Sequence, residues 1–299
     1  MIILKPIPLK TIWGGEKLKD YINYDYNEKI GQLYTVSAET GLDNEIAYGD
    51  FKGKTLSYVW NNNRALFNYD KTETFPLIIA LVDASDNLSI QIHPDDKFAI
   101  KNEHLKFGKE ESWIFLNAPK SGSIVNGCKV KDRSELNKLI DEKHWDDILD
   151  YLEVNENSYV HVSPCTLHAL TSGSFVYEIQ QSTNITYRFY DYDRVDAIGN
   201  KRELHLDKAL QVLNLKNKSS AKEAILNKEF DEKTYSILMK EKYYSNISNN
   251  STTFKCYSII DGSLKYDDIT LTKGMSFILF CNSSINIQGF AKLIIATPL

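Results

Sequence analysis

Cysteine is scarce in this 299-residue chain, and no two cysteines form a CxxC pair. Cys128, Cys165, Cys256 and Cys281 are widely scattered, which argues against a cysteine-based zinc finger. The N-terminus, MIILKPIPLK, has no charged leader followed by a long apolar stretch and a small-residue cleavage site. We therefore expect no signal peptide, a cytoplasmic protein and reduced thiols.

Long apolar runs, an excess of positive charge and phosphate-binding glycine loops are also missing. The longest apolar runs, residues 77–82 and 277–281, are of strand length, whereas a membrane-spanning helix needs about 20 residues. Lys and Arg number 35 against 40 Asp and Glu, a net charge of −5, which argues against a nucleic-acid partner. No GxGxxG or Walker motif occurs, and Gly14-Gly15 is read as a turn.

What the chain does have is aromatic and alternating sequence. It contains 18 Tyr and 13 Phe, and short alternating runs broken by glycine are typical of a β-rich fold. One helical segment is predicted over 132–152, opened by a capping box of Asp132 and Glu135 and continued by an apolar stripe that is imperfect around Trp145. Another is predicted over 206–215, and Asp95 suits a further helix start. Strands are predicted over 75–82, 88–93, 112–116, 159–162, 174–180 and 184–190.

The composition changes near residue 216. Residues 216–228 are rich in Lys, Ser and Ala and resemble a connector, and short strands separated by Gly or Asn follow. We therefore predict an N-terminal domain over 1–215, which carries the chemistry, and a smaller β unit over 216–299. Two β-units in one chain are consistent with two jelly rolls. The later strands are expected at 235–239, 253–260, 264–266, 269–271, 276–280, 285–287 and 291–296.

Four side chains form a candidate metal site. Gln91 and His93 project from one face of a predicted strand, Glu111 opens another strand, and His168 lies in a Leu-His-Ala segment. Two imidazoles, a carboxylate and an amide oxygen suit a catalytic zinc ion with room for substrate, and the same donors suit other divalent metals. Any one histidine alone is more often structural, and two His with a carboxylate would also suit a non-haem iron oxygenase.

Three further residues are candidates for catalysis. Arg188 lies between aromatic residues and could be aimed at an anionic oxygen, or it could pair with Asp191 or Asp193 to hold a loop. Lys109 lies two residues before Glu111 and could act as a base, although an exposed surface lysine is the commoner fate. Glu178 is a polar break in an apolar strand and needs a partner that a site could supply.

These segments together resemble the type I mannose-6-phosphate isomerases in their short bacterial form. The most specific stretch is DASDNLSIQIHPDD at 83–96, followed by GKEESW at 108–113, HAL at 168–170, EIQQS at 178–182 and TYRFYDYDR at 186–194. Each motif alone is weak, but five in order at compatible spacing are specific. The resemblance covers most of the chain and is loose at the C-terminal end.

The resemblance implies a mainly β, cupin-type double jelly roll with a few helices between strands. It implies one zinc ion held by Gln91, His93, Glu111 and His168, with Arg188 and Lys109 as catalytic residues. Glu178 and Ser89 are then expected to contact the substrate. The implied reaction interconverts mannose 6-phosphate and fructose 6-phosphate, so the partner is a small sugar phosphate, and nothing in the sequence fixes the oligomeric state.

The chain also departs from the family's pattern. Ala80 stands where a lysine is common, Gln32 and Tyr34 replace Glu and Trp, and Cys165 takes a glycine position. A cysteine would be strained there if that glycine has a positive φ. These departures leave open an alternative function, a cupin that binds sugars or sugar phosphates without turnover.

Overall fold

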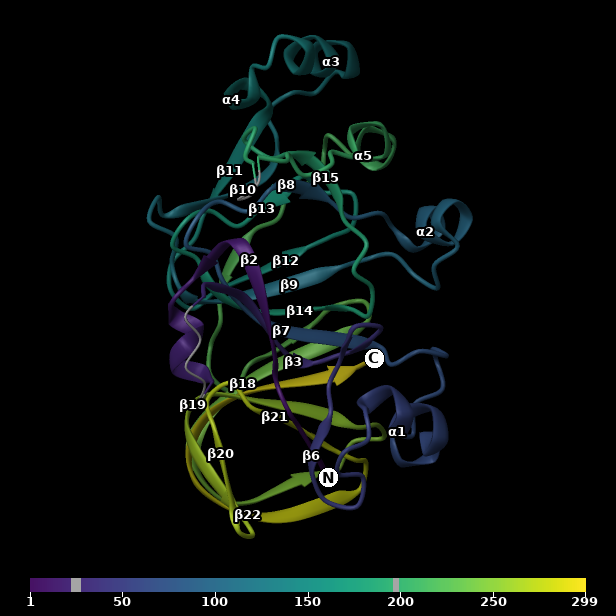
Figure 1. Ribbon diagram of the computed structural model, residues 1–299, viewed down its shortest axis with the longest axis vertical. Helices are drawn as coiled ribbons and strands as arrows, with labels where there is room; N and C mark the ends of the chain where they lie inside the picture. Colours follow the sequence, from purple (N-terminus) through teal and green to yellow (C-terminus); the bar gives the residue numbers. More distant parts are fainter. Residues whose placement is uncertain (23–27, 196–198) are drawn as a thin grey trace. The chain divides into compact units, whose positions relative to one another are not determined.

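The computed structural model describes residues 1–22, 28–195 and 199–299. Antiparallel strands dominate, with a few short helices between them (Figure 1), so the prediction of a mainly β, cupin-type fold is confirmed. The chain divides into two compact units, one of Met1–Lys10, Glu16–Leu81 and Ala224–Leu299 and one of Thr11–Gly15 and Val82–Glu223. The predicted domains 1–215 and 216–299 have other bounds and stay a prediction.

The second unit contains two sets of antiparallel strands. One set runs in the order β11 (Leu149–Glu153), β10 (Ser123–Cys128), β13 (His168–Ala169), β8 (Ile90–Ile92) and β15 (Tyr187–Tyr190). The other runs β16 (Ala221–Glu223), β12 (Ser158–Val162), β9 (Glu111–Asn117) and β14 (Phe175–Gln181). Side chains from both sets share a buried cluster, which includes Trp113, Phe115, Ile124, Val160 and Val176. The unit is thus a sandwich whose interior lies between them.

Four helices accompany the first set of strands (Figure 1). They are α2 (Asp96–Glu103), α3 (Arg133–Asp141), α4 (Trp145–Ile148) and α5 (Leu206–Val212). Their apolar side chains pack on Ile90, Ile92 and Phe189 from the strands. Asp95 and Asp132 cap α2 and α3 by accepting bonds from backbone N–H groups of the first turn, as the sequence predicted.

The prediction of one helical segment over 132–152 is wrong at its end. Lys143 has a φ of +59°, a conformation that interrupts a helix, and the single turn α4 follows. Residues 149–153 then form β11, in which Leu149 pairs with Cys128 of β10. The apolar stripe that suggested a helix comes from a helix and a strand that share one core.

The first unit is built on a long sheet. Its order is β17 (Glu229–Asp231), β18 (Tyr235–Asn249), β22 (Ser283–Pro298), β19 (Lys255–Tyr266), β21 (Ser276–Leu279), β1 (Ile2–Leu4) and β6 (Ile46–Tyr48), with β20 (Ile269–Thr272) on β19. Helix α1 (Leu56–Asn62) carries Trp60 into an aromatic cluster with Phe67, Phe75 and Phe254. The unit also holds β3 (Ile30–Val36), β4 (Ala38–Glu39) and β5 (Leu42–Asp43). The residues of β2 (Ile7–Gly15) and β7 (Leu77–Asp83) are divided between the two units.

The predicted breaks in the C-terminal strands are wrong at two glycines. Residues 253–266 and 283–298 contain single strands, β19 and β22, that continue through Gly262 and Gly289. Both glycines have a positive φ, and a Cβ at either would lie 2.2 Å from a carbonyl oxygen of the opposite strand. Glycine is therefore needed for a close crossing of two bent strands, not for a turn. Among the described residues, none of the helices has both the length and the apolar character needed to span a bilayer.

Candidate metal centre and active site

Strand register brings the predicted site residues together on one face of the five-stranded set. His168 on β13 is the register partner of Gln91 on β8, and Gln91 is the partner of Arg188 on β15. Directly opposed residues in antiparallel strands project on the same face. His168, Gln91 and Arg188 therefore form one row across three strands, although 97 positions separate the first and last of them in sequence, since 188 − 91 = 97.

Glu111, at the start of β9, meets the histidines from the other set of strands. Its Oε2 lies 3.4 Å from Nε2 of His93, and its Oε1 lies 3.2 Å from Nε2 of His168. One ligand atom from each of the three residues lies within 4.8 Å of the others, and all three side chains are buried. This spacing is what a single ion between them requires.

The hydrogen bonds identify which atoms face the centre. Nδ1 of His168 lies 2.9 Å from the carbonyl oxygen of Thr166. Because a carbonyl only accepts, this bond requires the proton on Nδ1, which leaves the Nε2 lone pair toward Glu111. Both ring nitrogens of His93 and Oε1 of Glu111 are buried without a hydrogen-bond partner. Buried acceptors that converge in this way fit a divalent cation, and the Thr166 bond is typical of support for a metal-bound imidazole.

The electrostatics favour the ligand forms of these groups. Burial, with a contribution from the Lys109 ammonium, lowers the pKa of His93 to about 3, so the ring is neutral. Burial alone would raise the pKa of Glu111, but Lys109 and the imidazoles outweigh it and hold that pKa well below its ordinary value. A neutral imidazole and an ionised carboxylate are the forms that bind metals.

Gln91 contacts this set of candidate metal ligands through His168. Its Nε2 lies 3.4 Å from Nε2 of His168. The oxygen and nitrogen of a glutamine amide exchange places by a half-turn of the terminal group, so its oxygen can face the same point. The arrangement is compatible with Gln91 as a fourth ligand.

Lys109 is buried and faces Glu111, contrary to the surface alternative. Its Nζ lies 3.0 Å from Oε2 of Glu111, and its backbone N–H donates to the Pro94 carbonyl. The preceding Gly108 packs so tightly that a Cβ there would lie 2.3 Å from that carbonyl oxygen. The glycine thus permits the close approach that places Lys109 at the centre.

Glu178 and Ser89 lie in the same unit. Oε1 of Glu178 accepts a hydrogen bond of 2.9 Å from the indole of Trp113. Burial, then the Glu111 carboxylate, raises the pKa of Glu178 above its ordinary value. Ser89 is buried directly before β8, two residues from Gln91, and its predicted contact with substrate stays a prediction.

Arg188 makes no ion pair with Asp191 or Asp193 among the residues placed by the structure. Asp191 instead pairs with Arg194 and Arg202, and Asp193 with Lys201. The Arg188 guanidinium donates from Nη1 to the Glu203 carbonyl, and its Nε has no hydrogen-bond partner. The loop-holding alternative is therefore not what the structure contains, and a donor remains for an anionic oxygen.

Two contributors to the site were missed from the sequence. Trp113 packs edge-on against His168 at 5.7 Å between ring centroids and also holds Glu178. The sequence feature that could have identified Trp113 is its place in the GKEESW motif. Thr166 contributes its backbone carbonyl, a group that every residue has, so its residue type could not have predicted this contact.

The strain anticipated at Cys165 is present. Its φ is +66°, in the region that favours glycine. Its backbone N–H donates a 2.7 Å hydrogen bond to the carbonyl of His93, so this conformation supports a residue of the centre.

Comparison with known proteins agrees with these motifs. The family model of the type I phosphomannose isomerase catalytic domain matches residues 2–122. The mannose-6-phosphate isomerase ManA of Bacillus subtilis is 30% identical over 270 residues, 87% of this chain and 85% of its own length. A mannose-6-phosphate isomerase of Streptococcus mutans is 33% identical, with 79% of this chain and 74% of its own covered. The crystal structure of a mannose 6-phosphate isomerase from Bacillus subtilis matches with a TM-score of 0.86 and 31% identity over 99% of each chain. The chain belongs to the family of type I phosphomannose isomerases.

Proposed function

We propose that this protein interconverts mannose 6-phosphate and fructose 6-phosphate, with one divalent metal ion held by Gln91, His93, Glu111 and His168. One observation within the chain supports this most directly. The buried ring nitrogens of His93 and Oε1 of Glu111 have no hydrogen-bond partner, and the two residues converge with Nε2 of His168. Family membership supplies the reaction, and the donor set fits zinc. The proposed location is the cytoplasm, and the proposed small-molecule partner is the sugar phosphate.

Aldose–ketose isomerisation moves a proton between C2 and C1 and passes through an enediolate. A bound divalent cation supplies a Lewis acid that polarises the substrate oxygens. Lys109, buried beside Glu111, is the proposed group that takes the proton from one carbon and returns it to the other. It would do so as the neutral amine, the form that a bound cation beside it would favour. Glu178 is the alternative proton carrier, a buried carboxylate whose pKa is raised by burial and by the Glu111 carboxylate.

Arg188 is proposed to stabilise the negative charge of the enediolate or to orient the substrate. Its backbone is fixed in β15 opposite Gln91, its Nη1 is held by the Glu203 carbonyl, and its Nε is unpaired. A guanidinium positioned before the reaction begins stabilises developing charge without reorganisation.

The first test is conversion of mannose 6-phosphate to fructose 6-phosphate by purified protein. Activity should be lost with chelator and return with added zinc, and metal analysis should find about one ion per chain. Arg188→Ala should lower kcat by at least about a hundredfold. The matched control is Arg133→Ala, at an exposed arginine that bonds the Leu210 carbonyl of α5. Folded, metal-loaded protein without turnover would overturn the proposed reaction, and undiminished turnover in Arg188→Ala would remove that residue from it.

A further inference from the structure

A separate cavity opens on the opposite face of the five-stranded set. Arg188 is the register partner of Gln91, but a register shift follows and Tyr190 pairs with Ile90. Gln91 and Ile90 are consecutive in β8 and therefore project on opposite faces. Tyr190 consequently belongs to the outer face, among the side chains that pack with Ile90 and Phe189, and not to the metal centre.

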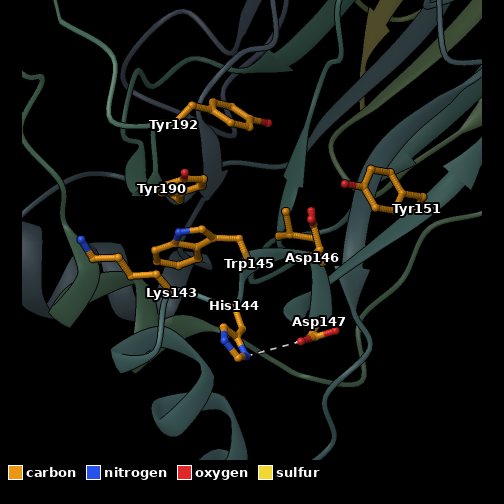
Figure 2. A pocket seen from close by; sticks show the side chains of 9 residues that line it. Lys143, His144, Trp145, Asp146, Asp147, Tyr151, Tyr190 and Tyr192 are labelled. Atoms are coloured by element: carbon orange, nitrogen blue, oxygen red, sulfur yellow. Dashed lines mark ion pairs between the residues drawn. The ribbon is translucent and has the colours of Figure 1, made fainter.

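Aromatic rings form much of the wall of this cavity (Figure 2). Its volume is about 530 Å³, within the range of small-molecule sites. Trp145 stacks on Tyr190 with centroids 4.1 Å apart and planes at 15°, and Tyr192 packs 5.1 Å from Tyr190. Figure 2 shows Tyr151 across from these rings with Asp146 between them. Tyr151 is 47% exposed, with Nζ of Lys129 5.9 Å from its ring centroid, so part of the ring remains accessible to a ligand.

Hydrogen-bonding groups surround these rings. Asp146, Asp147 and His144 lie on the wall, and His144 lies 3.6 Å from Asp147. Burial raises the pKa of Tyr190, and it raises that of Tyr192 to about 12. Both hydroxyls therefore stay protonated and can donate. An apolar ring face beside donors and acceptors matches a pyranose, which has apolar C–H faces and hydroxyl edges.

A second cavity adjoins the first. It measures about 390 Å³ and shares Asp146, Tyr151 and Tyr192 with it. The rest of its wall consists of Lys120, Val125 and a group of hydroxyl and amide side chains, from Asn87, Ser121, Ser123, Thr171 and Ser172. Two cavities that share one wall accommodate a ligand longer than a single sugar ring.

We propose that these adjoining cavities bind a neutral oligosaccharide, with one pyranose beside Trp145, Tyr190 and Tyr151 and the next among the serine and threonine hydroxyls. The walls of the two cavities carry Asp146 and Asp147 beside Lys143 and Lys120, so opposite charges balance and an anion such as a sugar phosphate gains no net attraction. A quaternary ammonium ion is also disfavoured. The Trp145 and Tyr190 faces are stacked on each other, so they cannot both surround a cation, and Lys143 lies on the wall.

The test is saturation-transfer NMR and calorimetry on the full chain, with mannotriose, cellotriose, methyl α-mannoside and tetramethylammonium as probes. A trisaccharide should bind about tenfold more tightly than the monosaccharide, because it occupies both cavities. Binding should persist when mannose 6-phosphate saturates the metal centre. A trisaccharide displaced by mannose 6-phosphate would place it at the metal centre and overturn the proposal.

Tyr151→Ala should weaken trisaccharide binding by about tenfold without changing kcat/KM of the isomerase. Tyr243→Ala is the matched control, since Tyr243 is a 66% exposed tyrosine on β18 in the other unit, and it should bind like the wild type. No trisaccharide binding at about 10 mM, binding of tetramethylammonium instead, or equal binding by Tyr151→Ala would each overturn the proposal.

Discussion

Oε1 of Glu111 lies 3.2 Å from Nε2 of His168, a ring whose other nitrogen is held by the Thr166 carbonyl. Strands from two different sheets supply these residues, so the distance depends on the packing of the sandwich rather than on either strand alone. The proposed metal site is accordingly made by the tertiary fold, and loss of either residue should be seen first in metal content.

Glu111→Gln should abolish stoichiometric metal binding. The substitution keeps the shape of the side chain but removes the negative charge that the cation and the buried Lys109 ammonium need. We expect kcat/KM to fall by about 10³ or more, the equivalent of several kcal/mol of lost stabilisation. Measurement of the metal content and the turnover of the folded variant checks this. Glu156→Gln, a substitution at an exposed glutamate, is the control. A variant with one tightly bound ion and normal activity would contradict the ligand assignment.

The metal-free protein should lose stability as the pH falls below neutrality. The pKa of His93 is about 3 when folded against 6.5 as the ordinary value. Between these values the unfolded chain binds the proton and the folded chain does not, so the free energy of unfolding decreases toward acid by up to about 1.4 kcal/mol per pH unit. The lowered pKa of Glu111 adds to this loss as the pH falls below about 4.5.

Glu178 acts with the opposite sign. Its pKa is raised in the fold, so its contribution is complete below its ordinary value and is lost as the pH rises through the folded pKa. Urea unfolding of the chelator-treated wild type and of His93→Asn, measured from pH 7 to pH 4, separates the contribution of His93 from those of Glu111 and Glu178. The variant should show a shallower slope over this window. Parallel curves would mean that His93 takes up its proton equally in both states.

Cys165 should accept glycine better than any branched residue. Its positive φ costs a non-glycine residue about 1 kcal/mol, and glycine would remove this cost. Glycine also raises the conformational entropy of the unfolded chain, which offsets part of the stabilisation. Cys165→Gly should therefore unfold at the same or a slightly higher urea concentration than the wild type. Burial raises the pKa of the Cys165 thiol. The thiol is therefore unreactive, and its removal should not itself affect the comparison.

Two further substitutions make the Cys165 test specific. Cys165→Ala removes the thiol but keeps a Cβ and should match the wild type. Cys165→Val should lose about 1–2 kcal/mol and should weaken metal retention, because the Cys165 N–H holds the His93 carbonyl. A valine variant as stable as glycine would show that the backbone there is unstrained.

Local patterns were sufficient to predict part of this fold. The caps at Asp95 and Asp132 and the strand that carries Gln91 depend on residues within one turn or on strict alternation. The continuous strands through Gly262 and Gly289 could not be predicted, because the need for glycine arises where two distant strands cross. Leu149 likewise joins a strand only because β10 offers it a partner.

The features of the site likewise divide into those that local sequence predicts and those that depend on the tertiary fold. The ligand types were predicted from motifs, and the structure brings His93, Glu111 and His168 together. The Thr166 carbonyl and the unpaired Nε of Arg188 depend on backbone and side-chain geometry that residue names do not encode. The cavity beside Trp145 depends on a register shift between Arg188 and Tyr190, and the only trace of it in the sequence was an imperfect helical stripe at that tryptophan.

Ala80, Tyr34 and Gln32, three departures from the family pattern, are connected in the first unit. Ala80 is fully buried and shares a cluster with Tyr34, whose hydroxyl donates a 3.2 Å hydrogen bond to Oε1 of Gln32. The small Ala80 side chain leaves room for the tyrosine ring, and the neutral amide suits a site without a lysine. We therefore expect the three residues to be coupled in their effect on stability.

Restoring the lysine alone should therefore be costly. Ala80→Lys places an ammonium among apolar side chains and should lower the free energy of unfolding by about 2–4 kcal/mol. Gln32→Glu alone should cost less, because that position is only partly buried. In the double variant the carboxylate and ammonium can pair, so the loss should be smaller than the sum by about 1–3 kcal/mol.

Urea unfolding of the four proteins measures this coupling. Ala80→Leu is the matched control, since it overpacks the same position without charge and should combine additively with Gln32→Glu. Coupling that is equally large with leucine would mean that the residues interact through volume alone. Losses for Ala80→Lys and Gln32→Glu that add to within about 0.5 kcal/mol would contradict the connection between the departures, and Ala80 would then be an independent change.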